Sequence, residues 1–365
     1  MKQLLIVNNF FLIFCVLFSG CSLLKIKPQS EALTFSFQCM LVNMDGQTLR
    51  RTYGNLCTYF EDGSLIVGSQ TEMSLISDEG RVIWSLPLNT HHNLKNINQT
   101  EFLVMNSSFD NYKKKWLRFD RISIYNKSAQ ELKYFDFSEH AADLTRRSKR
   151  SLNAAFDETF KSLQKDIFLL NVKTQEKFKP VFYEFSHANS VYRIPKNKMA
   201  KFIPAFAEGN FIVNINGLQL MLILDSELKS IIWSHEGLSP NTHDVQVIES
   251  GEILVYNNSF TEKSSAIELF NPLTKSRKVL YKGTPDHSFF ATTQGSVQIL
   301  PTGHLLISEI RKDELSRFFE VDQNGRFIRE WPARTEGLTG NLLSGLQEVK
   351  IINANKFLKN NKSLF

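Results

Sequence analysis

The 365-residue sequence predicts an all-β protein, a six-bladed β-propeller in which each blade has four strands. Three observations lead to this prediction. A short motif recurs at the start of a strand pair, three successive units are 56, 52 and 52 residues long, and each unit carries turn signals between short strands. A repeat of this kind determines the architecture, because one unit cannot bury its own apolar faces.

The recurring motif opens the first strand of each unit. In its clearest copy, an apolar second strand starts at Glu252, nine residues after His243. The same nine-residue step leads from His92 to Glu101, and a looser copy opens at His187 and resumes after an insertion. The six equivalent positions are Asn55, His92, His187, His243, Gly295 and Gln347.

The rest of each unit has the pattern of three further strands. A glycine turn such as Ser250-Gly251 precedes the second strand, and an Asp-x-x-Gly type of turn joins the third strand to the fourth. The fourth strand often ends in a tryptophan, which we assign to blade packing. These residues are Trp84, Trp233 and Trp331.

The two ends of the chain are predicted to share one blade. The last unit is short, whereas residues 35–51 have the pattern of a third and fourth strand around Asp45-Gly46. We therefore expect the N-terminal strands to complete the last blade and close the ring, which leaves no open edge strand.

One segment interrupts the repeat. His92 and His187 are 95 residues apart, and residues 138–164 have helical spacing of apolar residues without strand character. We expect a helical insertion over one mouth of the propeller, which could act as a lid or be only a decorated loop.

The N-terminal segment is predicted to lie outside the folded domain. We assign residues 1–20 to a lipoprotein signal peptide, residues 21–33 to a tether and residues 34–365 to the propeller. The apolar stretch of the leader, residues 10–18, is too short to span a membrane comfortably.

The end of the leader, Phe18-Ser19-Gly20-Cys21, resembles a bacterial lipobox. This resemblance implies cleavage before Cys21, lipidation of that residue and a protein that faces the periplasm. Ser22, in place of aspartate, resembles the default for sorting to the outer membrane. The alternative is an ordinary signal peptide that contains a cysteine.

Two cysteines remain when Cys15 leaves with the leader and Cys21 carries lipid. An even number of thiols in an oxidising compartment permits one disulfide between Cys39 and Cys57. Two buried and inert thiols are the alternative.

The charge of the chain does not indicate a polyanion ligand. The net charge is +6, and we interpret the densest basic clusters, at residues 113–115 and 146–150, as solvated loops. No nucleic-acid motif accompanies them, so we expect no nucleic-acid partner.

The repeated position carries the candidate chemistry. The first strand of each propeller blade lines the central channel, so residues at one register point toward one axial spot. Three of the six are histidines, His92, His187 and His243. Asn189 lies two residues beyond His187 and is expected on the same side of its strand.

The order of these motifs resembles the bacterial arylsulfotransferases over about residues 90–331. The matching motifs are His187-Ala188-Asn189-Ser190-Val191, Gly209 to Asn214, His243-Asp244, Gly251 to Asn258, and Gln294 to Gly303. The resemblance implies a six-bladed periplasmic propeller that moves a sulfuryl group from an aryl sulfate to a phenol, without a cofactor or a metal.

The resemblance also implies roles for individual residues. His243 corresponds to the nucleophile that becomes a sulfohistidine, His187 and Asn189 to the pair that binds sulfuryl oxygens, and His92 to a further channel histidine. A neutral imidazole suits this chemistry, because it is a competent nucleophile near neutral pH. We expect His92 to act as the general base toward the acceptor phenol.

The sequence departs from the family at one position. Where the family has an arginine, this chain has Asn216, and an amide cannot replace the charge and bidentate contact of a guanidinium. Either Arg193 or Lys201 takes its place, or the activity is weak, altered or absent.

Other interpretations remain open from the sequence. The three histidines could bind zinc instead. The chain could be a non-catalytic lipoprotein that scaffolds envelope or polysaccharide assembly, because a propeller hosts many functions. Phe289 and Phe290 either flank an aromatic substrate or pack in the core.

Overall fold

The fold is taken from a computed structural model of the chain. The structure describes residues 32–352, except 38, 44, 46–47, 53, 55, 70, 113, 149–160, 164–168, 171–176, 179–180, 240, 312–316 and 333–345. The predicted signal peptide, the lipidation site Cys21 and most of the predicted tether lie outside the described residues. No helix in the described part is long and apolar enough to cross a membrane.

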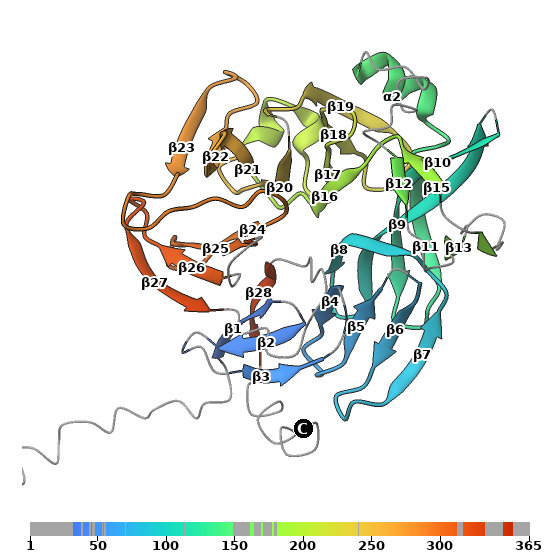
Figure 1. Ribbon diagram of the computed structural model, residues 1–365, viewed down its shortest axis with the longest axis horizontal. Coiled ribbons are helices and arrows are strands. Elements are labelled where there is room, and N and C mark those ends of the chain that lie inside the picture. The colour runs from blue at the N-terminus through green and yellow to red at the C-terminus, as the bar shows by residue number, and fades with distance from the viewer. Residues whose placement is uncertain are drawn as a thin grey trace, which may run out of the picture.

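Five antiparallel sheets have four strands each and are arranged around a ring (Figure 1). The first contains β4 (Leu56–Tyr59), β5 (Leu65–Gly68), β6 (Met73–Ile76) and β7 (Val82–Leu86). The second contains β16 (Ala188–Arg193), β17 (Phe211–Ile215), β18 (Leu220–Leu224) and β19 (Ile231–Glu236). The third contains β20 (Thr242–Val247), β21 (Ile253–Thr261), β22 (Ser264–Phe270) and β23 (Arg277–Tyr281). The fourth is β24 (Ser296–Ile299), β25 (Leu305–Glu309), β26 (Arg317–Val321) and β27 (Phe327–Pro332). The fold is therefore the all-β propeller that the repeat predicts.

The fifth four-stranded sheet joins the two ends of the described chain. Its order is β28 (Leu346–Ile352), β1 (Ala32–Phe37), β2 (Met40–Asn43) and β3 (Thr48–Arg51). β1 pairs antiparallel with β28 over its whole length. The N-terminal part of the chain thus supplies three strands to this sheet, one more than the sequence pattern predicted.

The prediction of six four-stranded blades is wrong, because the remaining sheet is larger. It contains β8 (Thr90–Asn96), β9 (Glu101–Tyr112), β10 (Lys115–Asn126), β11 (Glu131–Asp136), β15 (Val181–Glu184) and β12 (Lys161–Leu163). β9 and β10 have 12 residues each, and β11 pairs only with the second half of β10. β15 pairs in parallel with the uncovered half of β10, and a separate hairpin of β13 (Leu169–Leu170) and β14 (Lys177–Phe178) follows β12.

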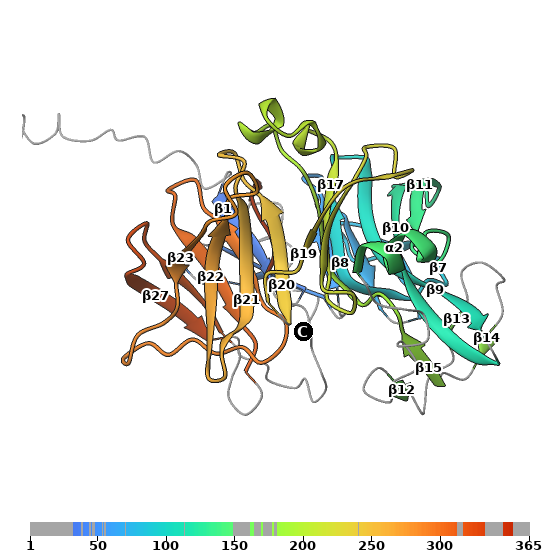
Figure 2. The same ribbon diagram turned by 90° about the horizontal axis from the view of Figure 1, so that it is seen from above.

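The predicted helical insertion is only partly correct. A helix, α2 (Ala141–Ser148), forms where the helical pattern begins, and residues 149–160 lie outside the described part of the chain. The last predicted helical turn is instead strand β12, because its backbone pairs with β15. Nor does α2 cover a mouth of the ring: it lies at the outer margin beside β19 (Figures 1 and 2), where Arg147 bonds Ser234 at 3.0 Å.

The apolar runs of the sequence are explained by sheets that are covered on both faces. All five residues of β18 are buried. Leu222 packs with the larger sheet through a cluster that includes Phe137, whereas Ile223 packs on the other face with Val255 of β21. Each blade face is thus buried by its neighbour, which is why no single unit could fold alone.

The inner strands are tied to one another by polar side chains. Asn93 Oδ1 accepts the backbone N–H of Val191 at 2.7 Å, linking β8 to β16. Asp244 Oδ2 accepts the N–H of Val297 at 2.6 Å, linking β20 to β24. Each acceptor directly follows a channel histidine in the sequence, so the second residue of the motif joins neighbouring blades.

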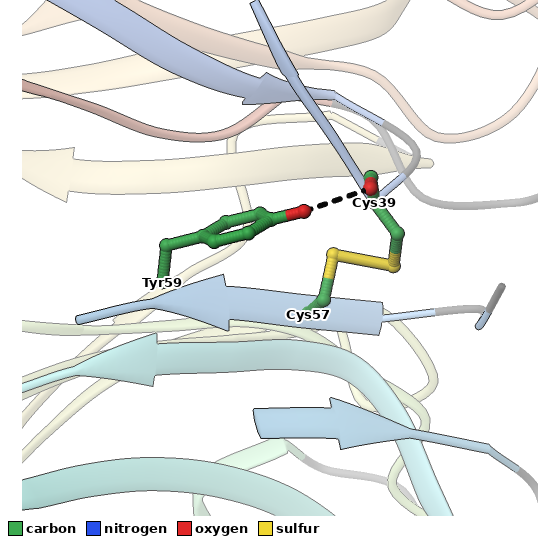
Figure 3. The surroundings of a disulfide bond; sticks show 3 residues. All are labelled: Cys39, Cys57 and Tyr59. Carbon is green, nitrogen blue, oxygen red and sulfur yellow. Dashed lines mark hydrogen bonds between the residues drawn. A yellow bond between two sulfur atoms is a disulfide. The ribbon is translucent and has the colours of Figure 1, made fainter. Parts of the chain in front are cut away.

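The structure joins the two remaining cysteines in a disulfide. Cys39, at the turn between β1 and β2, is bonded to Cys57 of β4 with a Cα–Cα distance of 5.4 Å (Figure 3). The hydroxyl of Tyr59 donates to the carbonyl of Cys39 at 3.0 Å. The bond therefore joins the sheet that contains both chain ends to the sheet that follows it.

We expect loss of this disulfide to destabilise the protein. A Cys39→Ser/Cys57→Ser variant should lose about 3 kcal/mol in free energy of unfolding, because the bond closes a loop of 18 residues. Urea denaturation followed by fluorescence would measure this value. A variant of unchanged stability would contradict the role that we assign to the bond.

Candidate functional site

The structure brings the three predicted histidines together. The ring centroids of His92 and His187 are 5.4 Å apart, and those of His92 and His243 are 6.5 Å apart. His92 and His243 lie on β8 and β20, and His187 directly precedes β16; these three strands are neighbours in the ring. The register argument from the repeat is thereby confirmed for these three positions.

Of the other members of the predicted channel ring, Gly295 is the one whose surroundings the structure describes. Asn55 and the side chain of Gln347 lie outside the described residues. Gly295 has φ +104°, and a Cβ at this position would lie 2.3 Å from the ring of Tyr256. Glycine is thus required there by close packing and not by ligand contact.

Irregular backbone aims the histidines. His92 and His187 have φ angles of +55° and +50°, in the left-handed region that non-glycine residues seldom occupy. The pairing register shifts at the same place in three strands, between Thr90 and Leu94, between Ala188 and Ser190, and between His243 and Gln246. Bulges and local strain of this kind cluster at functional sites, because they redirect side chains out of the regular ladder.

His243 is held in one tautomer. The amide nitrogen of Asn258 donates to the carbonyls of Ala291 (2.9 Å) and Gln294 (2.6 Å), so the amide oxygen of Asn258 faces His243. That oxygen lies 2.8 Å from Nδ1 of His243 and can only accept a hydrogen bond. The proton is therefore on Nδ1, and Nε2 carries the lone pair.

Burial keeps this imidazole neutral. His243 is 6% exposed, and desolvation lowers its pKa to about 4 although the hydrogen bond to Asn258 acts in the opposite direction. At neutral pH the ring thus presents an unprotonated Nε2, which is the form required of a nitrogen nucleophile.

His187 has the opposite charge preference. It forms a hydrogen-bonded ion pair with Glu184. Although burial opposes the charge, the bond to Glu184 and the negative charge of that carboxylate raise the pKa of His187. Burial likewise opposes ionisation of Glu184, but Arg118 and His187 lower its pKa to about 2. The site therefore combines one neutral and one readily protonated histidine.

The larger sheet places this acidic partner. Arg118 of β10 and Glu184 of β15 are directly paired residues in the parallel register, and their side chains are 2.8 Å apart. Glu184 is the last residue of β15, three residues before His187. The strand that breaks the four-stranded pattern thus ends with Glu184, and His187 lies in the short connection from β15 to β16.

The predicted substrate-binding asparagines have scaffold contacts. Asn189 is buried and donates its amide to the carbonyl of Thr242 at 2.8 Å, beside His243. Within the described residues its Oδ1 has no hydrogen-bond partner. Asn216 accepts the backbone N–H of Asn241 at 3.0 Å, which joins the ends of two blades.

Neither predicted substitute for the family arginine lies at the histidines. Arg193 ends β16, six residues from His187, which is roughly 20 Å along an extended strand. Lys201 ends a short 3₁₀ helix (Met199–Lys201) whose first residue packs against Gly251, in the turn at the far end of β20 from His243.

The cation near the histidines is instead Arg118, which the motif analysis missed. Its charge acts on His92 and His187 as well as on Glu184. The available signal was the two-residue spacing of Arg118 and Asp120 within one strand, which places both side chains on one face. The repeated motif includes neither residue, and both precede the predicted insertion at residues 138–164.

Phe289 and Trp84 make packing contacts within the fold. Phe289 is 2% exposed and packs against Tyr256, Tyr281 and Phe319. Trp84 donates to the carbonyl of Lys127 in the next sheet at 2.8 Å. Within the described part of the chain, no group of three or more histidine, cysteine, aspartate or glutamate side chains could hold a metal ion.

Comparison with known proteins shows the family. The model of the arylsulfotransferase (ASST) family matches residues 151–334, just over half of the chain. The chain therefore belongs to the arylsulfotransferase family, whose members transfer sulfuryl groups. The matched region contains His187, Asn189, Asn216 and His243, whereas His92 and Arg118 precede it.

Comparisons with individual proteins are less specific. No curated protein matches the sequence. A Bacteroides caccae protein of unknown function has a similar structure, with a TM-score of 0.49 and 12% identity over 88% of this chain and 99% of its own. TolB from Acinetobacter baumannii has a TM-score of 0.43 and 10% identity over 88% of this chain and 66% of its own.

We expect the tautomer of His243 to depend on Asn258. In an Asn258→Leu variant the Nδ1 proton loses its acceptor, so any reaction at Nε2 should slow by about 10- to 100-fold, equivalent to roughly 1.4–2.7 kcal/mol. ¹⁵N NMR of labelled histidine would show a mixed tautomer population. An unchanged spectrum would exclude this role.

Proposed function

We propose that the protein is a lipid-anchored periplasmic arylsulfotransferase that moves a sulfuryl group from an aryl sulfate to a phenolic acceptor through a sulfohistidine at His243. The observation that carries this proposal is the environment of His243. Its Nε2 is unprotonated, its Nδ1 is fixed by Asn258, and two further histidines lie in the same cluster.

In the first half-reaction, Nε2 of His243 attacks the sulfur of the aryl sulfate. An N–S bond forms, the bond between sulfur and the aryl oxygen breaks, and a phenolate leaves with the electron pair. The Nδ1–H stays bonded to Asn258 Oδ1, which stabilises the positive charge that develops on the ring.

The protonated form of His187 suits the sulfuryl oxygens. The reacting group is anionic, and the family arginine is absent at Asn216, so the site needs another positive charge. Of the three histidines, His187 is the one whose pKa is raised, through its bond to Glu184. Sulfuryl transfer, like phosphoryl transfer, depends mainly on such positioning and charge stabilisation.

In the second half-reaction, the acceptor phenol attacks the sulfur of the sulfohistidine. His92 removes the phenolic proton, the N–S bond breaks, and the electron pair returns to Nε2 of His243. Burial, followed by the charges of the neighbouring histidines, lowers the pKa of His92 well below its usual value. His92 is therefore neutral before this step and able to accept the proton.

The proposed location rests on the leader. The lipobox-like segment that ends at Cys21 supports lipidation, and Ser22 supports sorting to the outer membrane. The disulfide between Cys39 and Cys57 is also typical of an oxidising compartment such as the periplasm.

Release of 4-nitrophenol from 4-nitrophenyl sulfate tests the proposed reaction. With phenol as acceptor, the protein without its leader should release 4-nitrophenol catalytically. The His243→Ala substitution should abolish this release because no nucleophile remains. The matched control is His235→Ala, since His235 lies on an outer strand away from the cluster. If folded protein releases no product from several aryl sulfates, the scaffolding role becomes the better explanation.

The rate should depend on pH in two limbs. Activity should fall below about pH 4, where His243 becomes protonated, because its pKa is lowered to about 4. It should also fall on the alkaline side, where His187 loses its proton from a raised pKa. A Glu184→Gln variant removes the cause of this raised pKa and should move the alkaline limb to lower pH by about one unit. Identical profiles for both proteins would disprove the role of His187.

A further inference from the structure

A second histidine lies behind His92. Nδ1 of His91 is 2.9 Å from Nδ1 of His92, and the two rings are perpendicular with centroids 5.1 Å apart. Adjacent side chains on a regular strand point to opposite faces. Here they meet because His92 has a positive φ and the β8–β9 register shifts between Thr90 and Leu94.

The other nitrogen of His91 faces acceptors only. Nε2 is 3.1 Å from the backbone carbonyl of Asn106 and 3.2 Å from Oδ1 of Asp120. Neither oxygen can donate, since Asp120 is ionised: burial opposes its charge, but the contact with His91 and the charge of Arg118 lower its pKa. Nε2 of His91 therefore carries a proton.

The proton on Nε2 of His91 determines the tautomers of both His91 and His92. Burial and the charge of Arg118 lower the pKa of His91, so the ring is neutral and its Nδ1 has a lone pair. The short contact to His92 is then a hydrogen bond donated by Nδ1–H of His92. This leaves Nε2 of His92 as the unprotonated nitrogen.

We propose that His91 is a positioning residue for the acceptor step: with Asp120 behind it, it holds His92 in the tautomer whose Nε2 accepts a proton from the incoming phenol. This inference rests on the proposed function. When Nε2 takes the phenolic proton, His92 becomes an imidazolium, and its bond to His91 stabilises the new charge. The proton leaves to solvent before the next cycle.

The charged groups around His92 fit this order of events. Burial, followed by positive charge on His91, His187, His243 and Arg118, disfavours a charge on His92. Because His91 is neutral here, it acts on His92 through the lone pair that accepts the Nδ1–H. Asp120 is the negative group that faces His91. His92 is therefore kept neutral until a phenol delivers a proton. The carboxylate of Asp120 then stabilises the charge on His92 through the ring of His91.

Two variants of His91 separate positioning from packing. In His91→Gln, the amide can still accept from Nδ1–H of His92 while donating to the carbonyl of Asn106. In His91→Leu, a side chain of similar bulk offers neither contact. Thermal unfolding of both variants would establish that they fold as the unsubstituted protein does.

The two half-reactions are then measured separately. A burst of 4-nitrophenol without acceptor reports sulfuryl transfer to His243, and decay of the sulfated protein on adding a phenol reports the acceptor step. We expect His91→Leu to leave the burst within about threefold and to slow the acceptor step about 100-fold, the usual contribution of a general base. His91→Gln should retain most of the rate.

The acidity of the acceptor provides the decisive comparison. The defect of His91→Leu should shrink for phenols with a pKa below the assay pH, because these arrive as phenolates and need no base. Equal slowing of both half-reactions, or a defect that does not vary with acceptor acidity, would overturn the inference. So would a His91→Gln variant as slow as His91→Leu. Absence of any burst from the unsubstituted protein would instead refute the proposed function itself.

Discussion

Arg118 lies between the partly buried carboxylate of Glu184, 2.8 Å away, and the buried carboxylate of Asp120, 3.7 Å away. A buried charge is costly unless it is paired, and removal of one partner typically costs 3–5 kcal/mol. Each carboxylate also contacts a histidine: Glu184 bonds His187, and Asp120 lies against His91. The guanidinium therefore makes it possible to keep two carboxylates beside the histidines. Glu184 raises the pKa of His187, and Asp120 faces the protonated nitrogen of His91.

The irregular sheet is the structural source of this arrangement. Lengthening of β9 and β10 carries Arg118 and Asp120 beyond the part of β10 that β11 covers, and β15 returns in parallel to occupy the uncovered edge. The chain then enters β16 at Ala188, four residues after Glu184. An insertion that interrupts the repeat thus links two neighbouring inner strands and supplies the acidic partner of His187.

Hydrogen bonds between the inner strands offset the backbone strain of their left-handed residues. Left-handed residues such as His92, His187 and Asp244 cost free energy, of order 1–3 kcal/mol each. The same motif supplies compensation, because Asn93 and Asp244 accept backbone N–H groups of the next inner strand. One short sequence motif therefore both aims a histidine at the channel and fixes the adjacent blades, which explains why its two polar residues occur together.

The sequence by itself determined the propeller class, the four strands of five of the units, and the convergence of His92, His187 and His243, because these depend on a repeat whose register survives folding. It also narrowed the two remaining cysteines to one pairing. Tertiary structure alone decided which groups surround the histidines. Asn258 and Glu184 are 15 and three residues from their imidazole partners, and Arg118 is 66 residues from Glu184. Contacts made by bulges and by an inserted parallel strand leave no periodic signal, so protonation states could not be deduced from the motif.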